Sequence, residues 1–243
     1  MATTAEARRL TEAHRQTQFR LRAAAASDTL EIWRRIFDPS DIDASWSRME
    51  PAVEAVTRDY RRQSSGLAAA YYRNHRSAEG VPGRAEPRLA AQPPRDALRY
   101  SLGFYGLVRP NELLRAGRPD VAQQAGVHLV GGVSRHVNDG GRETIINTVQ
   151  ADERARGWQR ITAGDPCSFC AMIAARGAVF REDTANFESH DHCACSAEPV
   201  YSRGDQRPER AREWQQLWNE STRGVSGVRA QRNAFRRAYE GRA

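Results

Sequence analysis

Residues 167–195 read CSFCAMIAARGAVFREDTANFESHDHCAC and contain every cysteine of the 243-residue chain. The cysteines form two pairs, and two histidines stand just before the second pair: Cys167-x-x-Cys170, His190, His192 and Cys193-x-Cys195. Zinc takes four soft or borderline ligands in a tetrahedron, and a Cys-x-x-Cys turn supplies two of them from one segment. The window therefore predicts a structural zinc ion, Zn2+, that ties two chain segments together.

The expected metal ligands are the four cysteines, and the two histidines are alternate ligands or hydrogen-bonding neighbours of the ligands. A metal held in this way stabilises folding directly, because the unfolded chain has no preformed site.

Three other interpretations of the cysteines compete with the metal site. Disulfides between the two pairs are geometrically easier than bridges within a pair, since an i to i+2 bridge is strained. The thiols could also be reduced and buried. In the third interpretation, Cys193 or Cys167 is a nucleophile and His190 or His192 is its base. A thiolate cage accounts for all four cysteines together, whereas a nucleophile accounts for one.

The composition favours a polar, basic protein kept in a reducing compartment. The formal net charge is +7, all 37 basic residues counted as Lys or Arg are arginine, and the mean hydropathy is −0.73. No apolar run approaches the roughly 18–20 residues that a membrane span needs, and the N-terminus lacks the apolar core of a signal peptide. We therefore expect no membrane contact, and a cytoplasmic setting favours metal over disulfides.

The first half of the chain is predicted to be helical, so that the fold is mainly α with a small α+β C-terminal module. Residues 1–77 are expected to form a long helical hairpin that breaks at Asp38-Pro39-Ser40. Residues 78–95 are rich in proline and glycine and read as a linker.

Residues 96–200 are expected to form a core region that begins with short helices at 96–107 and 111–116. A longer helix over 119–137 is expected to end at the turn signal Asn138-Asp139-Gly140-Gly141, and another helix is expected over 142–156.

The module at 158–200 is predicted to be a β-ribbon and a helix clasped by the Cys/His residues. Strands are expected at 157–161, 178–180 and 194–201. A short helix at 168–176 should end at Gly177.

The segment 201–243 reads as a basic helical tail. Ten arginines against five acidic residues give it +5 of the chain's +7. Helices are expected at 208–219 and 228–240. The candidate residues for nucleic-acid or partner binding are Arg229, Arg232, Arg236, Arg237, Trp214 and Trp218. The arginines favour a polyanion such as packaged DNA, and the tryptophans would suit docking on an acidic protein surface. A solvated helical face is the third interpretation.

An ordered series of residues resembles a known family. The series is Trp158-x-Arg160, Asp165-Pro166-Cys167-x-x-Cys170, Arg176-Gly177 and His190-x-x-Cys193-x-Cys195. It is similar to the C-terminal core of Mu F-like minor head proteins of tailed bacteriophages, in the version found in phages of actinobacteria. About forty residues carry the likeness, and Ala194 stands where the family has an arginine.

The resemblance implies a structural minor capsid protein that acts in head morphogenesis. Such a protein would be assembled in the host cytoplasm and would lie in the virion head near the portal. Its partners would be the portal, other head proteins and the packaged DNA, with no small-molecule substrate. The expectation is that it is not an enzyme, since the chain has no G-x-S-x-G or H-E-x-x-H motif. A zinc-dependent nucleic-acid-binding protein and a capsid maturation protease are the alternatives.

Overall fold

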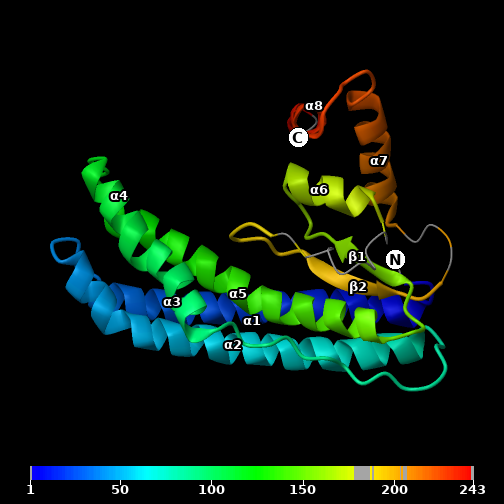
Figure 1. Ribbon diagram of the computed structural model, residues 1–243, viewed down its shortest axis with the longest axis horizontal. Coiled ribbons are helices and arrows are strands. Elements are labelled where there is room, and N and C mark those ends of the chain that lie inside the picture. The colour runs from blue at the N-terminus through cyan, green and yellow to red at the C-terminus, as the bar shows by residue number, and fades with distance from the viewer. Residues whose placement is uncertain (1, 178–186, 188, 203, 205–206, 242–243) are drawn as a thin grey trace.

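The computed structural model describes residues 2–177, 187, 189–202, 204 and 207–241. A long bundle of helices carries a smaller module on one side, as Figure 1 shows. The elements of the first part are α1 (Ala5–Ile36), α2 (Ile42–Ala78), α3 (Arg95–Gly103), the π-helical turn η1 (Phe104–Val108), α4 (Arg109–Arg115) and α5 (Val121–Ala151). Those of the module are β1 (Gly157–Ile161), α6 (Ser168–Ala175), β2 (Ser196–Val200), α7 (Glu209–Ser221) and α8 (Val228–Glu240). The predicted fold class, mainly α with a small α+β module, is confirmed.

Helices α1 and α2 form the predicted hairpin. The side chains of Thr4 and Asp41 cap their N-termini by accepting hydrogen bonds from backbone N–H groups. The hydroxyl groups of Thr11 and Tyr71 lie 2.9 Å apart, and Gln18 donates to the carbonyl of Ser64. Because early residues of α1 meet late residues of α2, the two helices run antiparallel.

Helix α5 packs against both helices of the hairpin, so the core is a three-helix bundle rather than an isolated hairpin. The expected turn at 138–141 is wrong, because α5 continues through it without a break. Glycines allow its backbone to approach neighbouring elements closely: a Cβ added at Gly140 would lie 2.5 Å from the carbonyl oxygen of Arg61. The glycines that suggest a turn thus serve helix packing instead.

The extended segment 79–94 lies along the bundle. The backbone N–H groups of Arg88 and Ala90 donate to the hydroxyls of Thr148 and Thr144 on α5. The helices before and after this segment share one hydrophobic cluster. The division of the chain at residues 78–95 remains a prediction.

Two of the expected strands form an antiparallel pair, in which Gly157 lies opposite Val200 and Ile161 opposite Ser196. The fully buried Glu198 on β2 attaches this sheet to the bundle. Its carboxylate accepts hydrogen bonds from Thr11 on α1 and from Gln159 on β1, both at 2.6 Å. The third expected strand, 178–180, lies outside the described residues.

Helices α6, α7 and α8 share a separate hydrophobic cluster. Trp214 of α7 is buried there with Phe235 of α8, and Trp218 packs against the same cluster. In this structure Trp214 is buried and Trp218 is half-buried, both packed in this cluster, and their role in partner binding remains a prediction.

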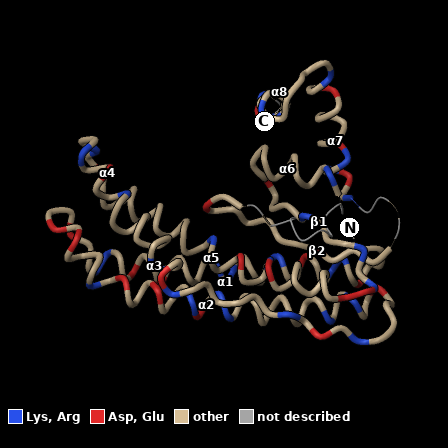
Figure 2. Tube along the Cα trace, in the orientation of Figure 1, with Lys and Arg blue, Asp and Glu red and all other residues tan. Residues whose placement is uncertain are grey.

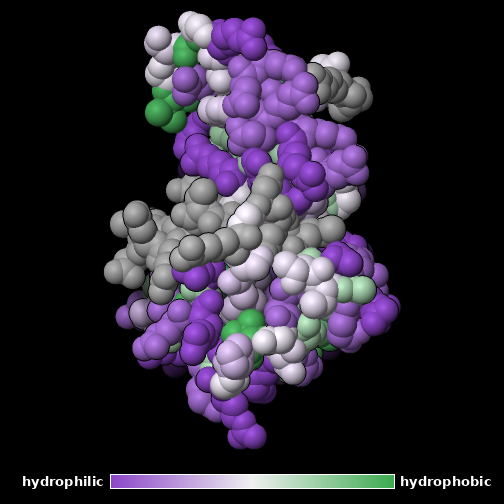
Figure 3. All heavy atoms as spheres, turned by 90° about the vertical axis from the view of Figure 1, so that its right-hand side faces the viewer, coloured by the Kyte–Doolittle hydropathy of each residue, from purple (hydrophilic) through white to green (hydrophobic). Residues whose placement is uncertain are grey.

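The surface is mostly polar, in keeping with the low mean hydropathy. Figure 3 shows one face, on which hydrophilic residues dominate and apolar residues form small separate patches. Among the described residues, no helix has both the length and the apolar character required to span a lipid bilayer.

Candidate metal centre

The first cysteine pair is positioned by the start of α6. Cys167 is the N-cap residue, and its sulfur accepts a hydrogen bond from the backbone N–H of Cys170 at 3.4 Å. Cys170 is buried, whereas Cys167 is the exposed member of the four cysteines. Gly177 has φ +69°, which ends this helix as expected. The short helix thus directs one sulfur inward and leaves the other at the surface.

The second pair is brought to the first by the β-sheet. Strand β1 leads into Cys167, and Cys193 and Cys195 directly precede strand β2. Because β1 and β2 are antiparallel neighbours, the end of one strand lies beside the start of the other. The two cysteine pairs therefore meet at one edge of the sheet, and Cys170, Cys193 and Cys195 form a buried cluster.

The donor atoms fall into two overlapping groups that share Cys170. The sulfur atoms of Cys170, Cys193 and Cys195 lie within 4.8 Å of one another. The donors of Cys167, Cys170 and His190 form the second group at the same limit. The Cys170–Cys193 sulfur distance is 3.7 Å, close to the edge of about 3.8 Å in a tetrahedron with Zn–S bonds of about 2.3 Å. The residues present fit a thiophilic cation such as zinc.

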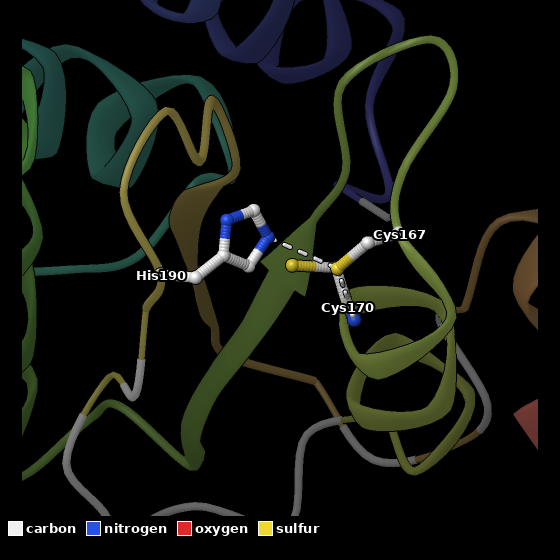
Figure 4. Close-up of side chains that lie close together, drawn as sticks. All are labelled: Cys167, Cys170 and His190. Carbon is white, nitrogen blue, oxygen red and sulfur yellow. Dashed lines mark hydrogen bonds between the residues drawn. The ribbon is translucent and has the colours of Figure 1, made fainter. Parts of the chain in front are cut away.

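His190 is oriented as a ligand of such a centre would be. Its Nδ1 lies 2.6 Å from the carbonyl oxygen of Asp191, and its Nε2 lies 3.0 Å from the sulfur of Cys167. A carbonyl oxygen can only accept a hydrogen bond, so Nδ1 carries the proton and Nε2 offers its lone pair to Cys167. Figure 4 shows the Cys167 sulfur between the imidazole ring and the start of α6.

His192 belongs to neither group. Its ring lies against α5, where a Cβ on Gly131 would be 2.6 Å from its Nε2. Its own backbone has φ +64°, a conformation rare for residues other than glycine. His192 therefore packs on the bundle in this structure, and its expected role as an alternate ligand or neighbour of the ligands remains a prediction.

Sequence reasoning missed Arg142, the residue that holds the second pair in place. This arginine of α5 is 2% exposed and donates three hydrogen bonds of 2.8–3.0 Å to the backbone carbonyls of Cys193 and Cys195. Asn138, one turn earlier, donates to the carbonyl of Cys193 at 2.9 Å. Nothing in the sequence marks this role, because one arginine among 37 has no distinguishing signal.

A second buried arginine lies on the other side of the cysteines. Arg160 of β1 is 2% exposed; its guanidinium lies 3.7 Å from the centre of the Phe187 ring and 3.5 Å from the sulfur of Cys170. Arg142 lies over the same ring at 4.5 Å. A centre in which three or more thiolates bind one divalent cation would carry a net negative charge. The buried guanidinium groups of Arg142 and Arg160 would compensate this charge.

The buried thiols differ in their affinity for protons. The pKa of Cys193 lies well below its usual range. The main cause is its hydrogen bond with Cys170; the hydrogen bond with Cys195 and the positive charge of Arg142 lower it further. The same bond to Cys193 raises the pKa of Cys170. Of these two thiols, Cys193 is therefore the one that loses its proton more readily.

An open cavity of about 640 Å³ adjoins the exposed side of the centre. Its lining includes Cys167 and His190, together with Arg210 and Trp214 of α7 and Tyr239 of α8. None of the three buried cysteines lines it. The centre thus has a closed side that faces α5 and an accessible side that faces α7 and α8.

A family model described as VG15 protein matches residues 2–221. The match covers α1 through α7 and the whole cysteine window. No curated protein and no solved structure gives a significant match.

Proposed function

Because the chain belongs to the VG15 protein family, a family of phage gene products, we propose that it is a structural minor capsid protein of a tailed phage. It would lie in the head near the portal and act in head assembly or in the passage of DNA. The family match supports the viral origin, and the Cys/His series shared with Mu F-like cores supports the place in the head. The portal and other head proteins would be its partners.

One observation carries the structural part of this proposal: Cys170 of the first pair lies in a buried cluster with Cys193 and Cys195 of the second pair, and Cys167 and His190 form an adjoining group that shares Cys170. Three of the four cysteines are buried, and the side chains of Arg142 and Asn138 hold the loop that carries two of them. Such an arrangement suits a clasp that fixes the module to the bundle. Zn2+ is the proposed ion.

Quantitative mass spectrometry of purified virions tests the place in the head. The protein should be present in every particle in far fewer copies than the major capsid protein, and antibody gold should label the portal vertex. A phage that lacks the gene should give defective heads. Absence of the protein from gradient-purified virions, or full infectivity without the gene, would contradict the proposal.

Elemental analysis together with a thiol count tests the clasp. The purified protein should contain one zinc per chain, and Cys170→Ser, Cys193→Ser and Cys195→Ser should each lose the metal and lower the melting temperature. A metal-free wild-type protein purified under reducing conditions, with unchanged stability in added zinc, would rule the clasp out.

A second candidate function rests on the contact between Cys167 and His190 at the accessible side. In a capsid maturation protease, the Cys167 sulfur would attack a peptide carbonyl while His190 Nε2 takes the thiol proton. The histidine would pass this proton to the leaving amine as the C–N bond breaks, and water would then hydrolyse the thioester and restore the thiol. Cys193 cannot take this role in this structure, because it is buried away from the cavity.

Single substitutions distinguish the two functions. If Cys167 is a nucleophile, catalysis depends on this one sulfur. Cys167→Ser would then abolish head-protein cleavage, and the variant would retain the metal and the stability of the wild type. For a clasp, Cys167→Ser would weaken metal binding and leave head-protein processing in infected cells unchanged.

A further inference from the structure

Helix α8 presents four arginines to solvent, called here the α8 arginine stripe (Arg229, Arg232, Arg236 and Arg237). Three of them follow one another at i, i+3 and i+7, which places them on one face of the helix. All four are exposed. Figure 2 shows α8 on the far side of α6 from the bundle.

The charge of the C-terminal helices is concentrated on α8. Four arginines against Glu240 give this helix a net charge of +3, whereas two arginines against three glutamates give α7 a net charge of −1. Of the two helices in the tail, α8 therefore carries the excess positive charge, and α7 carries none.

The stripe is also unpaired, whereas several exposed arginines of the bundle form ion pairs. Within the described residues, none of its four guanidinium groups makes an ion pair. On the surface of the bundle, Arg9, Arg35, Arg62 and Arg109 each pair with an acidic residue of the same helix. Unpaired guanidinium groups retain their full attraction for an external anion.

Packing holds the stripe in a fixed orientation. On the opposite face of α8, Ala234 and Phe235 are buried against α6 and α7. The hydroxyl of Tyr239 donates to the carbonyl of Pro166 at 2.6 Å. The arginines therefore face outward from a helix that is docked on the module.

The chemistry of this face indicates its partner. Trp214 and Trp218 contact Tyr239 and Phe235 on another face of α8, so the stripe has no aromatic anchor beside it for a protein partner. It also has no aromatic platform on which unpaired bases could stack. The stripe therefore offers a partner only its positive charge. This charge extends about 10 Å along the helix from Arg229 to Arg236, which equals about three base pairs of a duplex.

We propose that the α8 arginine stripe binds the phosphate backbone of double-stranded DNA without sequence preference. Guanidinium groups form paired hydrogen bonds with phosphate oxygens and release condensed counterions. This inference names a partner beyond the proposed place in the head. DNA binding is tested on the purified protein, so this proposal can fail while the proposed role in the head stands.

Point substitutions test the proposal better than deletion of the tail, because removal of α7 and α8 would expose the buried face of α6. The test variant is Arg229→Gln/Arg232→Gln/Arg236→Gln/Arg237→Gln. The matched control is Arg9→Gln/Arg35→Gln/Arg62→Gln/Arg109→Gln, which removes the same charge from ion-paired positions on the bundle.

Binding of a fluorescent 30-base-pair duplex is measured by anisotropy between 50 and 200 mM salt. Three or four phosphate contacts predict that the affinity of the wild-type protein falls roughly 40- to 150-fold over this range. The stripe variant should bind at least about tenfold more weakly at 50 mM salt, and its salt slope should be smaller by about 3. The control should stay within about threefold of the wild type.

Four results would overturn the proposal. The first is no duplex binding by the wild-type protein at 50 mM salt, and the second is equal loss in the stripe and control variants. Tighter binding of single-stranded DNA than of duplex is the third. The fourth is stripe-dependent binding of polyglutamate as tight as that of duplex, which would assign the stripe to an acidic protein surface.

Discussion

Glycine residues of α5 determine how closely the three long helices approach one another. A Cβ at Gly132 would lie 2.5 Å from the ring of Tyr105, and one at Gly140 would lie 2.5 Å from a backbone oxygen of α2. A side-chain ring can move aside, but the backbone of a packed helix moves only at a cost in free energy. Gly140 is therefore the least replaceable of these glycines.

We expect Gly140→Ala to lower the free energy of unfolding by about 1–3 kcal/mol, because the added methyl overpacks the contact between α5 and α2. Gly66→Ala on α2 is the matched control. Its Cβ would meet nothing within 4 Å, so it should stabilise the protein by about 0.5–1 kcal/mol through helix propensity. Urea unfolding of both variants measures the difference, and equal effects would contradict the packing role.

Buried histidines make the bundle sensitive to acid. His14 stacks on Tyr71 with the ring centres 4.2 Å apart. Burial, with a smaller contribution from His75, lowers the pKa of His14 to about 3. The imidazole is therefore neutral in the folded protein over the whole range in which an exposed histidine becomes charged.

This lowered pKa predicts a loss of stability below about pH 6.5. Both states are neutral at higher pH; as the pH falls, the unfolded chain takes up the proton first, which favours unfolding until the pH reaches about 3. The cost is about 1.4 kcal/mol per pH unit for this one histidine. His14→Phe retains the ring stack and removes the titration, so its unfolding free energy should fall less steeply between pH 6.5 and 4.5. Parallel curves for the two proteins would show that His14 does not contribute.

At the scale of elements, the loop before β2 is held by one face of α5. Arg135, Asn138 and Arg142 lie along this face and contact the loop 189–195. Arg142 bonds to the carbonyls of two expected metal ligands. Helix α5 therefore holds Cys193 and Cys195 in position through hydrogen bonds to their loop. The pairing of β1 with β2 brings this second cysteine pair beside the first pair.

We expect Arg142→Gln to weaken metal binding by about 10- to 100-fold, the usual range for groups that orient ligands. Competition with a chromogenic chelator measures the affinity, and circular dichroism shows whether the bundle remains folded. Arg142→Lys should recover little, because one ammonium group cannot reproduce three hydrogen bonds. Arg135→Gln, which loses contacts with Asp191 and Ser101 but none with a cysteine, should stay close to the wild type. An unchanged affinity in Arg142→Gln would remove this positioning role.

The whole molecule consists of a helical bundle with its own core and a module whose core is small. The bundle core is formed by α1, α2, α3, η1, α4 and α5. The module has the α6–α7–α8 cluster, the cysteines and a two-stranded sheet, and one face of this sheet packs on α2 and α5 through Trp158 and Ala197. A two-stranded sheet is barely stable alone in water. The metal centre is therefore expected to matter more for the module than for the bundle.

Metal removal should loosen the module and leave the bundle folded. Hydrogen exchange of the chelated protein should rise in β1, α6 and β2, while α1 and α2 keep their protection. Added zinc at a hundred times its dissociation constant should restore about 2.7 kcal/mol. A uniform rise in hydrogen exchange over the whole chain after chelation would show instead that the bundle and the module unfold together.

The sequence by itself determined the helices, the two strands and the window that contains the candidate metal ligands. Helical periodicity, capping residues and cysteine spacing are local properties, so they can be read without knowledge of the fold. The same local rules made α5 look broken, because glycine signals a turn in isolation and close packing in a bundle.

Only the tertiary structure decided which side chains meet. It placed His190 beside Cys167, directed His192 and the tryptophans of α7 toward the protein's own packing, and brought Arg142 to the cysteine loop. These contacts join residues far apart in the chain, and the side-chain type alone does not specify a distant partner. Burial and ion pairing are likewise properties of the folded surface, which is why the unpaired arginines of α8 can be told from ion-paired ones such as Arg9 and Arg62 only after folding.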